Sequence, residues 1–269
     1  MNKKNLYLSN LAWHKNDTIK IFELLKYYEI KGIDLAPIRL HDNWLLAEKK
    51  AKKFNKTLKE FNLKINAIQG IFFKTNFNLF EDNKIKNKKL INHFKRIVRI
   101  SKIYNCKKII LGSSNFRYNK NLNKKDADIK FIDFFQKIAP LFKKNKISIC
   151  FEPIPKQYGE NYLYNLKDLV ALIKKIKSPW MKINFDTSMY HYKKFSKKVF
   201  LNNIRLIKNI QISEKKFLFF DKPSKNNKLF CKTLKKLSQH NDVSLEMISS
   251  KTNLIKFKNS VENLRFLLN

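Results

Sequence analysis

Eight short apolar segments rich in β-branched residues alternate with eight helical segments along the whole chain, and this alternation restricts the fold more than any other feature. Consecutive apolar segments end 25 to 42 residues apart. A strand followed by a helix that returns to the next parallel strand takes about 30 residues or more. The eight apolar segments are expected strands, and their expected ends are Asn10, Pro37, Gly70, Gly112, Glu152, Asp186, Gln211 and Glu246.

Eight strand–helix units without a long linker predict one parallel (β/α)8 barrel, a TIM barrel, that spans residues 1–269 as a single domain. In the clearest helical segment, Leu166, Leu169, Val170 and Ile173 repeat with the spacing of a helix that buries one face. An open doubly wound sheet is the alternative, but no GxGxxG follows the first expected strand. The expected helices cover residues 19–28, 44–61, 89–104, 129–144, 166–176, 199–206, 229–238 and 254–268.

The formal charge of +37 is spread over the chain and does not by itself indicate nucleic-acid binding. The 58 lysines and arginines are not gathered in one arm, and they accompany abundant Asn, Ile and Phe. Solvated lysines on outer helices account for this distribution. We therefore disfavour nucleic acid as a partner and expect a surface that attracts anionic small molecules, phosphorylated ones above all.

The remaining composition indicates a cytoplasmic protein without a membrane partner. The three cysteines, Cys106, Cys150 and Cys231, are far apart and lie in or beside apolar runs, which is typical of reduced thiols. No apolar stretch approaches the roughly 20 residues of a membrane span. A monomer and a homo-oligomer both stay open.

Four expected strand ends carry oxygen-bearing side chains: Glu152, Asp186, Gln211 and Glu246. The apolar run before Glu152 stops at Pro153, which cannot donate to a sheet. Because the carboxyl ends of barrel strands meet at one face, the three carboxylates would repel one another unless a cation lay among them. Oxygen ligands favour Mn2+ or Mg2+, so we expect one such divalent ion as cofactor.

Short motifs at these strand ends give the chain a resemblance to a known family. Phe-Glu-Pro at 151–153, Asn-Phe-Asp-Thr-Ser at 184–188, Gln-Ile-Ser-Glu at 211–214 and Ser-Leu-Glu at 244–246 resemble the xylose isomerase-like TIM barrel superfamily, in its sugar phosphate isomerase/epimerase branch with the ketose 3-epimerases. The segments 9–13 and 32–37 resemble the first two strands of that branch. The likeness covers essentially the whole chain.

The resemblance implies a metal-dependent isomerase or epimerase of carbohydrate metabolism that acts on a sugar or sugar phosphate. It implies that Glu152, Asp186, Gln211 and Glu246 bind the metal and that the two glutamates lie on opposite faces of the sugar. One glutamate would remove the proton beside the carbonyl to give an enediolate, and the other, or the same one, would return a proton. Isomerisation and epimerisation both stay open.

The chain departs from the family pattern at Gln211, where such families carry a histidine. An amide can ligate only through its neutral oxygen, so the site loses its nitrogen ligand and shifts toward hard metals. This departure keeps a second hypothesis open, a degenerate barrel that binds a sugar or a partner protein without catalysis.

Other residues near the strand ends are candidate substrate contacts. Trp13 could form a wall for a sugar ring, Gln69 could bind a hydroxyl, and Ser113 with Arg117 could hold an anion. Two further candidates follow later strands, Tyr158 as a closing side chain and Glu214 as a contact beyond Gln211. A third hypothesis, an apurinic-site endonuclease, is disfavoured because its histidine-rich metal cluster would need ligands that strands three and four do not offer.

Overall fold

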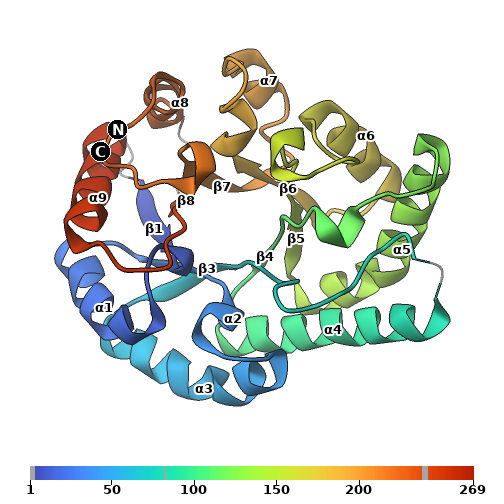
Figure 1. The fold of residues 1–269 in the computed structure, drawn as a ribbon, viewed down its shortest axis with the longest axis horizontal. Helices are drawn as coiled ribbons and strands as arrows, with labels where there is room; N and C mark the ends of the chain where they lie inside the picture. The colour runs from blue at the N-terminus through green and yellow to red at the C-terminus, as the bar shows by residue number, and fades with distance from the viewer. Residues whose placement is uncertain (1–3, 82, 238–241) are drawn as a thin grey trace.

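A computed structural model describes residues 4–81, 83–237 and 242–269, and it confirms the predicted (β/α)8 barrel (Figure 1). Eight parallel strands form a closed barrel in sequence order, and β1 pairs with β8 to close it. The strands are β1 (Asn5–Ser9), β2 (Gly32–Leu35), β3 (Lys64–Ile68), β4 (Lys108–Leu111), β5 (Ser148–Phe151), β6 (Met181–Asp186), β7 (Ile207–Ser213) and β8 (Asp242–Glu246).

Helices surround the barrel in the order in which they occur in the chain (Figure 1). Asparagine side chains cap the N-termini of several of them, since Asn43, Asn83, Asn123, Asn165 and Asn253 each accept a hydrogen bond from a backbone N–H of the first turn. The helices are α1 (Thr18–Tyr27), α2 (Pro37–Leu40), α3 (Trp44–Glu60), α4 (Lys84–Ile103), α5 (Lys124–Asn145), α6 (Leu166–Ile176), α7 (Lys197–Asn202), α8 (Lys225–Lys235) and α9 (Leu254–Leu268).

Helix boundaries differ from the expected ones mainly at the N-termini. The helices α4 and α5 each begin five residues before the expected start, because capping by Asn83 and Asn123 nucleates a polar first turn that shows no apolar periodicity. Pro37 begins α2 instead of ending a strand, which suits proline because the first helical residue needs no N–H donor. The helix expected over 229–238 begins at Lys225, and residue 238 lies outside the described residues.

Strand ends match the expectation closely, with one shift that affects the site. Gln211 lies two residues before the end of β7, which continues to Ser213. Its Cα pairs with that of Asp186 on one side and that of Ser244 on the other. The side chain of Gln211 therefore lies deeper in the barrel than a strand-end position would place it.

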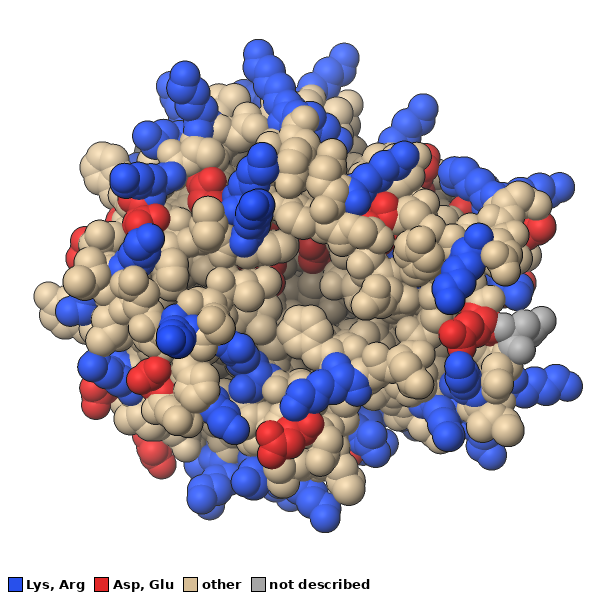
Figure 2. All heavy atoms as spheres, in the orientation of Figure 1, with Lys and Arg blue, Asp and Glu red and all other residues tan. Residues whose placement is uncertain are grey.

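In the view of Figure 2, most charged side chains lie at the periphery of the molecule. Lysines and arginines are spread over the outer parts of this face, while the central hollow is bordered mainly by uncharged residues and has acidic atoms inside it. This distribution agrees with the expectation of solvated lysine side chains. None of the described helices has the length and apolar character that a membrane crossing requires.

Candidate active site

A cavity of about 410 Å³ opens at the carboxyl end of the barrel, and three of the four predicted strand-end residues line it. Gln211 and Glu246 contribute side chains from β7 and β8, and Glu152 contributes one from the residue that follows β5. Phe73 and Phe217 supply apolar walls from the loops after β3 and β7. A cavity that combines apolar walls with a few converging polar groups is the usual form of a small-molecule site.

Glu152 directly follows β5 and is 7% exposed. Its carboxylate accepts a 2.9 Å hydrogen bond from Asn184 Nδ2. Gly112 leaves room for it, because a Cβ at residue 112 would lie 2.5 Å from Glu152 Oε2. Burial, followed by the negative charge of Asp186, raises the pKa of Glu152 to about 8, although Asn184 and Arg117 act in the opposite direction.

Asp186 ends β6 and is completely buried. Its Oδ1 accepts a 2.6 Å hydrogen bond from Ser213 Oγ and another from the backbone N–H of Ser188. Its Oδ2 is buried, and no amide, hydroxyl or backbone N–H of the described residues donates to it. The carboxyl group of Glu246 is within hydrogen-bonding reach of Asp186. Glu246 can therefore donate to Asp186 when protonated, and a cation could take the place of that proton when Glu246 is ionised.

Glu246 ends β8 and lines the same cavity as Glu152. Burial raises the pKa of Glu246 well above its ordinary value, and the negative charges of Asp186 and Glu152 raise it further. Three buried carboxylates from β5, β6 and β8 therefore influence one another electrostatically. The cavity favours a bound proton or cation that relieves this repulsion.

Gln211 holds a central place among the side chains that fill the barrel. Its Oε1 accepts a 2.6 Å hydrogen bond from Asn184 Nδ2, and its Nε2 donates to Gln69 Oε1 at 2.8 Å and to Asp34 Oδ2 at 3.1 Å. Both donor positions of the amide nitrogen and one acceptor position of the oxygen are thus occupied by protein partners. Since a carbonyl oxygen has two lone pairs, Oε1 keeps one acceptor position free.

Gln211 belongs to an amide chain inside the barrel, formed by Asn66, Asn209, Asn184, Gln211 and Gln69. Each amide nitrogen donates to the oxygen of the next residue in that order, at 2.6 to 3.2 Å, and Gln69 Nε2 ends the chain on a serine hydroxyl at 2.5 Å. All five side chains are buried. A buried polar network in which every group is paired fixes the orientation of its members.

Four asparagine or aspartate residues of this interior were not among the predicted site residues: Asp34, Asn66, Asn184 and Asn209. One signal could have identified two of them, because Asn184 is two residues before Asp186 on β6 and Asn209 is two residues before Gln211 on β7. Residues with that spacing point to the same face of the sheet. Polar residues at alternate positions of a barrel strand indicate a polar interior.

Arg117 is fully buried and lies behind Glu152. Its Nε donates to Glu160 Oε2 at 2.7 Å, and its Nη2 donates to the backbone oxygen of Glu152 at 2.6 Å. Glu160 also accepts hydrogen bonds from the backbone N–H groups of Tyr162 and Leu163. Arg117 therefore contacts the main chain at Glu152 and does not line the cavity.

The remaining predicted contacts divide between the cavity and the protein interior. Gln69, Ser113 and Tyr158 line the cavity. Trp13 is completely buried beside Phe257, and Glu214 is buried. Neither Trp13 nor Glu214 lines the cavity.

Tyr158 connects three loops over the cavity. Its hydroxyl lies 3.1 Å from His191 Nδ1 and accepts a 3.0 Å hydrogen bond from the backbone N–H of Lys216. His191 Nε2 is 2.8 Å from the carbonyl oxygen of Ser213, which assigns the proton to Nε2 and makes the tyrosine the donor to Nδ1. The loops after β5, β6 and β7 are thereby joined at one side chain.

The side-chain oxygen atoms at the cavity are of the kind that binds a divalent cation. Glu152, Asp186 and Glu246 supply carboxylate oxygens, and no amide, hydroxyl or backbone N–H of the described residues donates to the buried Asp186 Oδ2. In the described part of the chain, no three His, Cys, Asp or Glu side chains lie as a ready-made metal cluster. The carboxylates would therefore have to turn toward the ion when it binds.

The family and fold of the chain also follow from its similarity to known proteins. The sequence model described as xylose isomerase-like TIM barrel matches residues 22–269. A comparison with curated protein sequences gives no match. The family match therefore carries the assignment.

Solved structures with the same fold include two sugar epimerases. The apo 3-keto-D-glucoside 4-epimerase of E. coli superposes with a TM-score of 0.78 at 12% identity, over 98% of this chain and 100% of that one. A D-psicose 3-epimerase crystallised in the presence of D-fructose gives 0.75 at 14% identity, over 98% and 96%. A family 2 AP endonuclease from Brucella melitensis gives 0.74 at 14% identity, over 97% of each chain.

Proposed function

The chain belongs to the xylose isomerase-like TIM barrel family, and we propose that it is a metal-dependent isomerase or epimerase of a sugar or sugar phosphate. The single observation that carries the proposal is that Glu152 and Glu246 line one cavity from different strands. Two glutamates that face one substrate can move a proton off and onto the carbon beside a carbonyl.

The raised pKa values suit the two glutamates for proton transfer. A buried carboxylate with a pKa near 8 is a stronger base, once ionised, than an exposed one, and it returns its proton near neutral pH. One glutamate removes the proton next to the carbonyl, and the electron pair becomes that of an enediolate. The proton returns to the same carbon from the opposite face in epimerisation, or to the neighbouring carbon in isomerisation.

Residues around the pair keep it in place. Asn184 donates to the carboxylate of Glu152, and Arg117 donates to its main chain. Phe73 and Phe217 exclude water from the walls of the cavity. Gln69, Ser113 and Tyr158 are the candidates for binding the hydroxyl or phosphate groups of the substrate.

Glu152, Asp186, Gln211 and Glu246 are the residues that would hold one divalent ion, Mn2+ or Mg2+. The assignment is supported by the mutual repulsion of the carboxylates and by Asp186 Oδ2, to which no amide, hydroxyl or backbone N–H of the described residues donates. When bound, the ion supplies positive charge that stabilises a developing negative charge on the substrate oxygens.

Solvent exchange tests the proposed proton transfer. The protein, first freed of metal and then supplied with Mn2+ or Mg2+, is incubated in deuterated water with a panel of ketoses and ketose phosphates. We expect deuterium at the carbon beside the carbonyl, and we expect Glu246→Gln to abolish its entry. Glu60→Gln, an exposed change on α3, is the matched control and should retain full exchange.

A second candidate, a barrel that binds a sugar without reaction, is favoured by one observation. The amide of Gln211 is engaged at both ends, which is the state expected of a structural side chain. Saturable sugar binding by calorimetry, with no deuterium entry under any metal, would select this alternative and exclude the first.

The endonuclease hypothesis gains nothing from the cavity. Among the described residues, those that line it include two glutamates and no histidine. Cleavage of a duplex with an abasic site at physiological salt is the assay that separates the two enzymes, since positive charge alone gives binding without cutting.

A further inference from the structure

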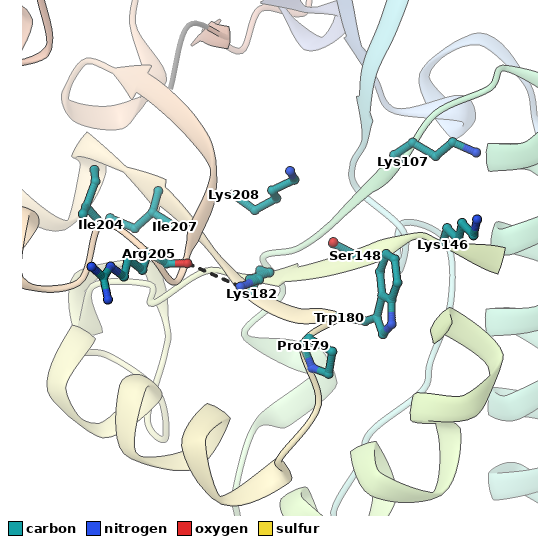
Figure 3. Close-up of a pocket in the computed structure, with 10 residues that line it drawn as sticks. All are labelled: Lys107, Lys146, Ser148, Pro179, Trp180, Lys182, Ile204, Arg205, Ile207 and Lys208. Atoms are coloured by element: carbon teal, nitrogen blue, oxygen red, sulfur yellow. Dashed lines mark hydrogen bonds between the residues drawn. The ribbon is translucent and has the colours of Figure 1, made fainter. Parts of the chain in front are cut away.

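A second and larger cavity, of about 700 Å³, lies at the opposite end of the barrel, where β4 to β7 begin (Figure 3). Its lining residues lie one to three residues before these strands or occupy the first two positions of a strand. Cavities of a few hundred to about 1,000 Å³ accept ligands the size of a nucleotide. Its charged and aromatic lining residues are Lys107, Lys146, Trp180, Lys182, Arg205 and Lys208.

The charge of this cavity exceeds what the basic composition alone provides. About one residue in five of the chain is Lys or Arg, whereas five of the ten lining residues are cationic and none is acidic. The cavity at the carboxyl end has 22 lining residues, and Lys74 is its one cation. A third cavity, beside Trp44, has three cations among its nine described lining residues, so basic residues take a larger share at the strand-start cavity than at either of the other two.

The cations are free to bind an anion. Lys182 Nζ donates to the backbone oxygen of Arg205 at 3.3 Å, which holds that ammonium group over the cavity and leaves it two further donors. In the described residues, no carboxylate forms an ion pair with any of the five cations. Like charges gathered on a concave wall repel one another and focus a positive potential into the hollow, so a multiply charged anion would stabilise them.

Trp180 supplies a flat apolar surface on one side of the cavity. In Figure 3 its indole ring lies near Lys146 and Ser148, across the cavity from Lys182 and Arg205. Trp180 directly precedes β6, and its backbone oxygen accepts a 2.9 Å hydrogen bond from Ile149, so its main chain is fixed by the sheet. Aromatic faces next to basic groups bind the bases of nucleotides by stacking.

We propose that this cavity binds a small nucleoside polyphosphate, with its phosphates among the strand-start cations and its base against Trp180. The site is distinct from the carboxylate site, since the two cavities share no lining residue and lie at opposite ends of the parallel strands. The binding is independent of the proposed isomerase or epimerase activity.

Calorimetry with ATP and with inorganic tripolyphosphate tests the proposal on the full chain. We expect ATP to bind about five- to 150-fold more tightly than tripolyphosphate, which corresponds to the about 1–3 kcal/mol that base stacking contributes. Trp180→Ala should weaken ATP to the level of tripolyphosphate and leave tripolyphosphate unchanged. Equal binding of the two ligands by the unmodified protein would overturn the proposal.

A pair of charge reversals locates the site. Lys182→Glu/Lys208→Glu should weaken both ligands by about tenfold or more, while Lys52→Glu/Lys53→Glu, which changes the net charge equally on the exposed face of α3, should change them less than about twofold. Equal weakening by both double variants would mean that only the overall charge attracts the anion, and it would refute the site.

Intrinsic tryptophan fluorescence provides a second readout. Trp13 is 0% exposed, and Trp44 is 6% exposed and lines a separate cavity, so Trp180 is the most exposed of the three tryptophans. Saturable quenching by ATP that persists in Trp44→Phe supports the proposal. Absence of quenching at ligand concentrations that saturate the calorimetric signal contradicts it.

Discussion

The guanidinium group of Arg117 donates a 2.6 Å hydrogen bond to the backbone oxygen of Glu152, and both residues are buried. The same guanidinium pairs with Glu160 at 2.7 Å, with both side chains 0% exposed. Glu160 lies in the loop after β5 and also binds two backbone N–H groups of that loop. One buried ion pair thus holds both the main chain of the candidate base and the loop that follows it.

Arg117→Met should lower the free energy of unfolding by about 3–5 kcal/mol, because it leaves the carboxylate of Glu160 buried without its cation. Arg117→Met/Glu160→Gln should recover most of that loss, since the second change removes the unpaired charge. Urea unfolding of the two variants measures both effects. A double variant that is as unstable as the single one would show that the pair contributes through packing alone.

The metal-free protein should lose stability as the pH rises from about 5 to about 8. The ordinary pKa of glutamate is 4.5, and that of Glu152 in the folded protein is about 8. Between these values the folded state binds more protons than the unfolded state, so the free energy of unfolding falls with rising pH. Glu152→Gln should make the free energy of unfolding depend less on pH, whereas Glu60→Gln should leave the dependence unchanged. Urea unfolding at several pH values measures this for the three proteins.

Gly112→Ala should reduce solvent deuterium exchange by about tenfold or more, because its Cβ would displace the carboxylate of Glu152 from a position 2.5 Å away. The fold should survive, since the group that must move is the end of a flexible side chain. Glu152→Asp, which shortens that side chain, provides the control background. If Gly112→Ala reduces exchange in that background as strongly as in the unmodified protein, contact with the carboxylate is not the cause.

Gln211→His should shift the metal preference toward Zn2+ relative to Mg2+. An imidazole nitrogen is a better ligand for zinc than an amide oxygen, whereas Mg2+ prefers oxygen. The change also removes the hydrogen bonds from Gln211 to Asp34 and Gln69, so thermal stability should fall. Calorimetric titration with both metals is the measurement, and an unchanged ratio of the two affinities would remove Gln211 from the set of ligands.

The barrel and the strand ends of the site were predictable from the sequence. Runs of β-branched residues mark the strands, and Glu152, Asp186 and Glu246 end or follow them as expected. Family resemblance gave the same fold that the closed sheet shows. Helix starts were less predictable, because an asparagine cap can begin a helix within a lysine-rich segment that has no apolar pattern.

The connections between site residues could not be predicted from the sequence. Gln211 and Asp34 are 177 positions apart, and their hydrogen bond depends on the register of a closed sheet. Arg117 is an instructive case, since a lone arginine after a strand has the same local sequence whether it binds a ligand or a buried glutamate. Only packing distinguishes the two.

The carboxylate site is complete only when the barrel closes, because β8 carries Glu246 and pairs with β1 at the other end of the chain. Glu246 lies on β8, whose pairing with β1 joins Asn5 to Asp242, residues 237 apart in sequence. Contacts between such distant residues cost more loop-closure entropy than local contacts, so we expect them to form late in folding. A partly folded chain can assemble the neighbourhood of Glu152 while still lacking its opposing glutamate, so the appearance of proton exchange during refolding would time the joining of the first and last strands.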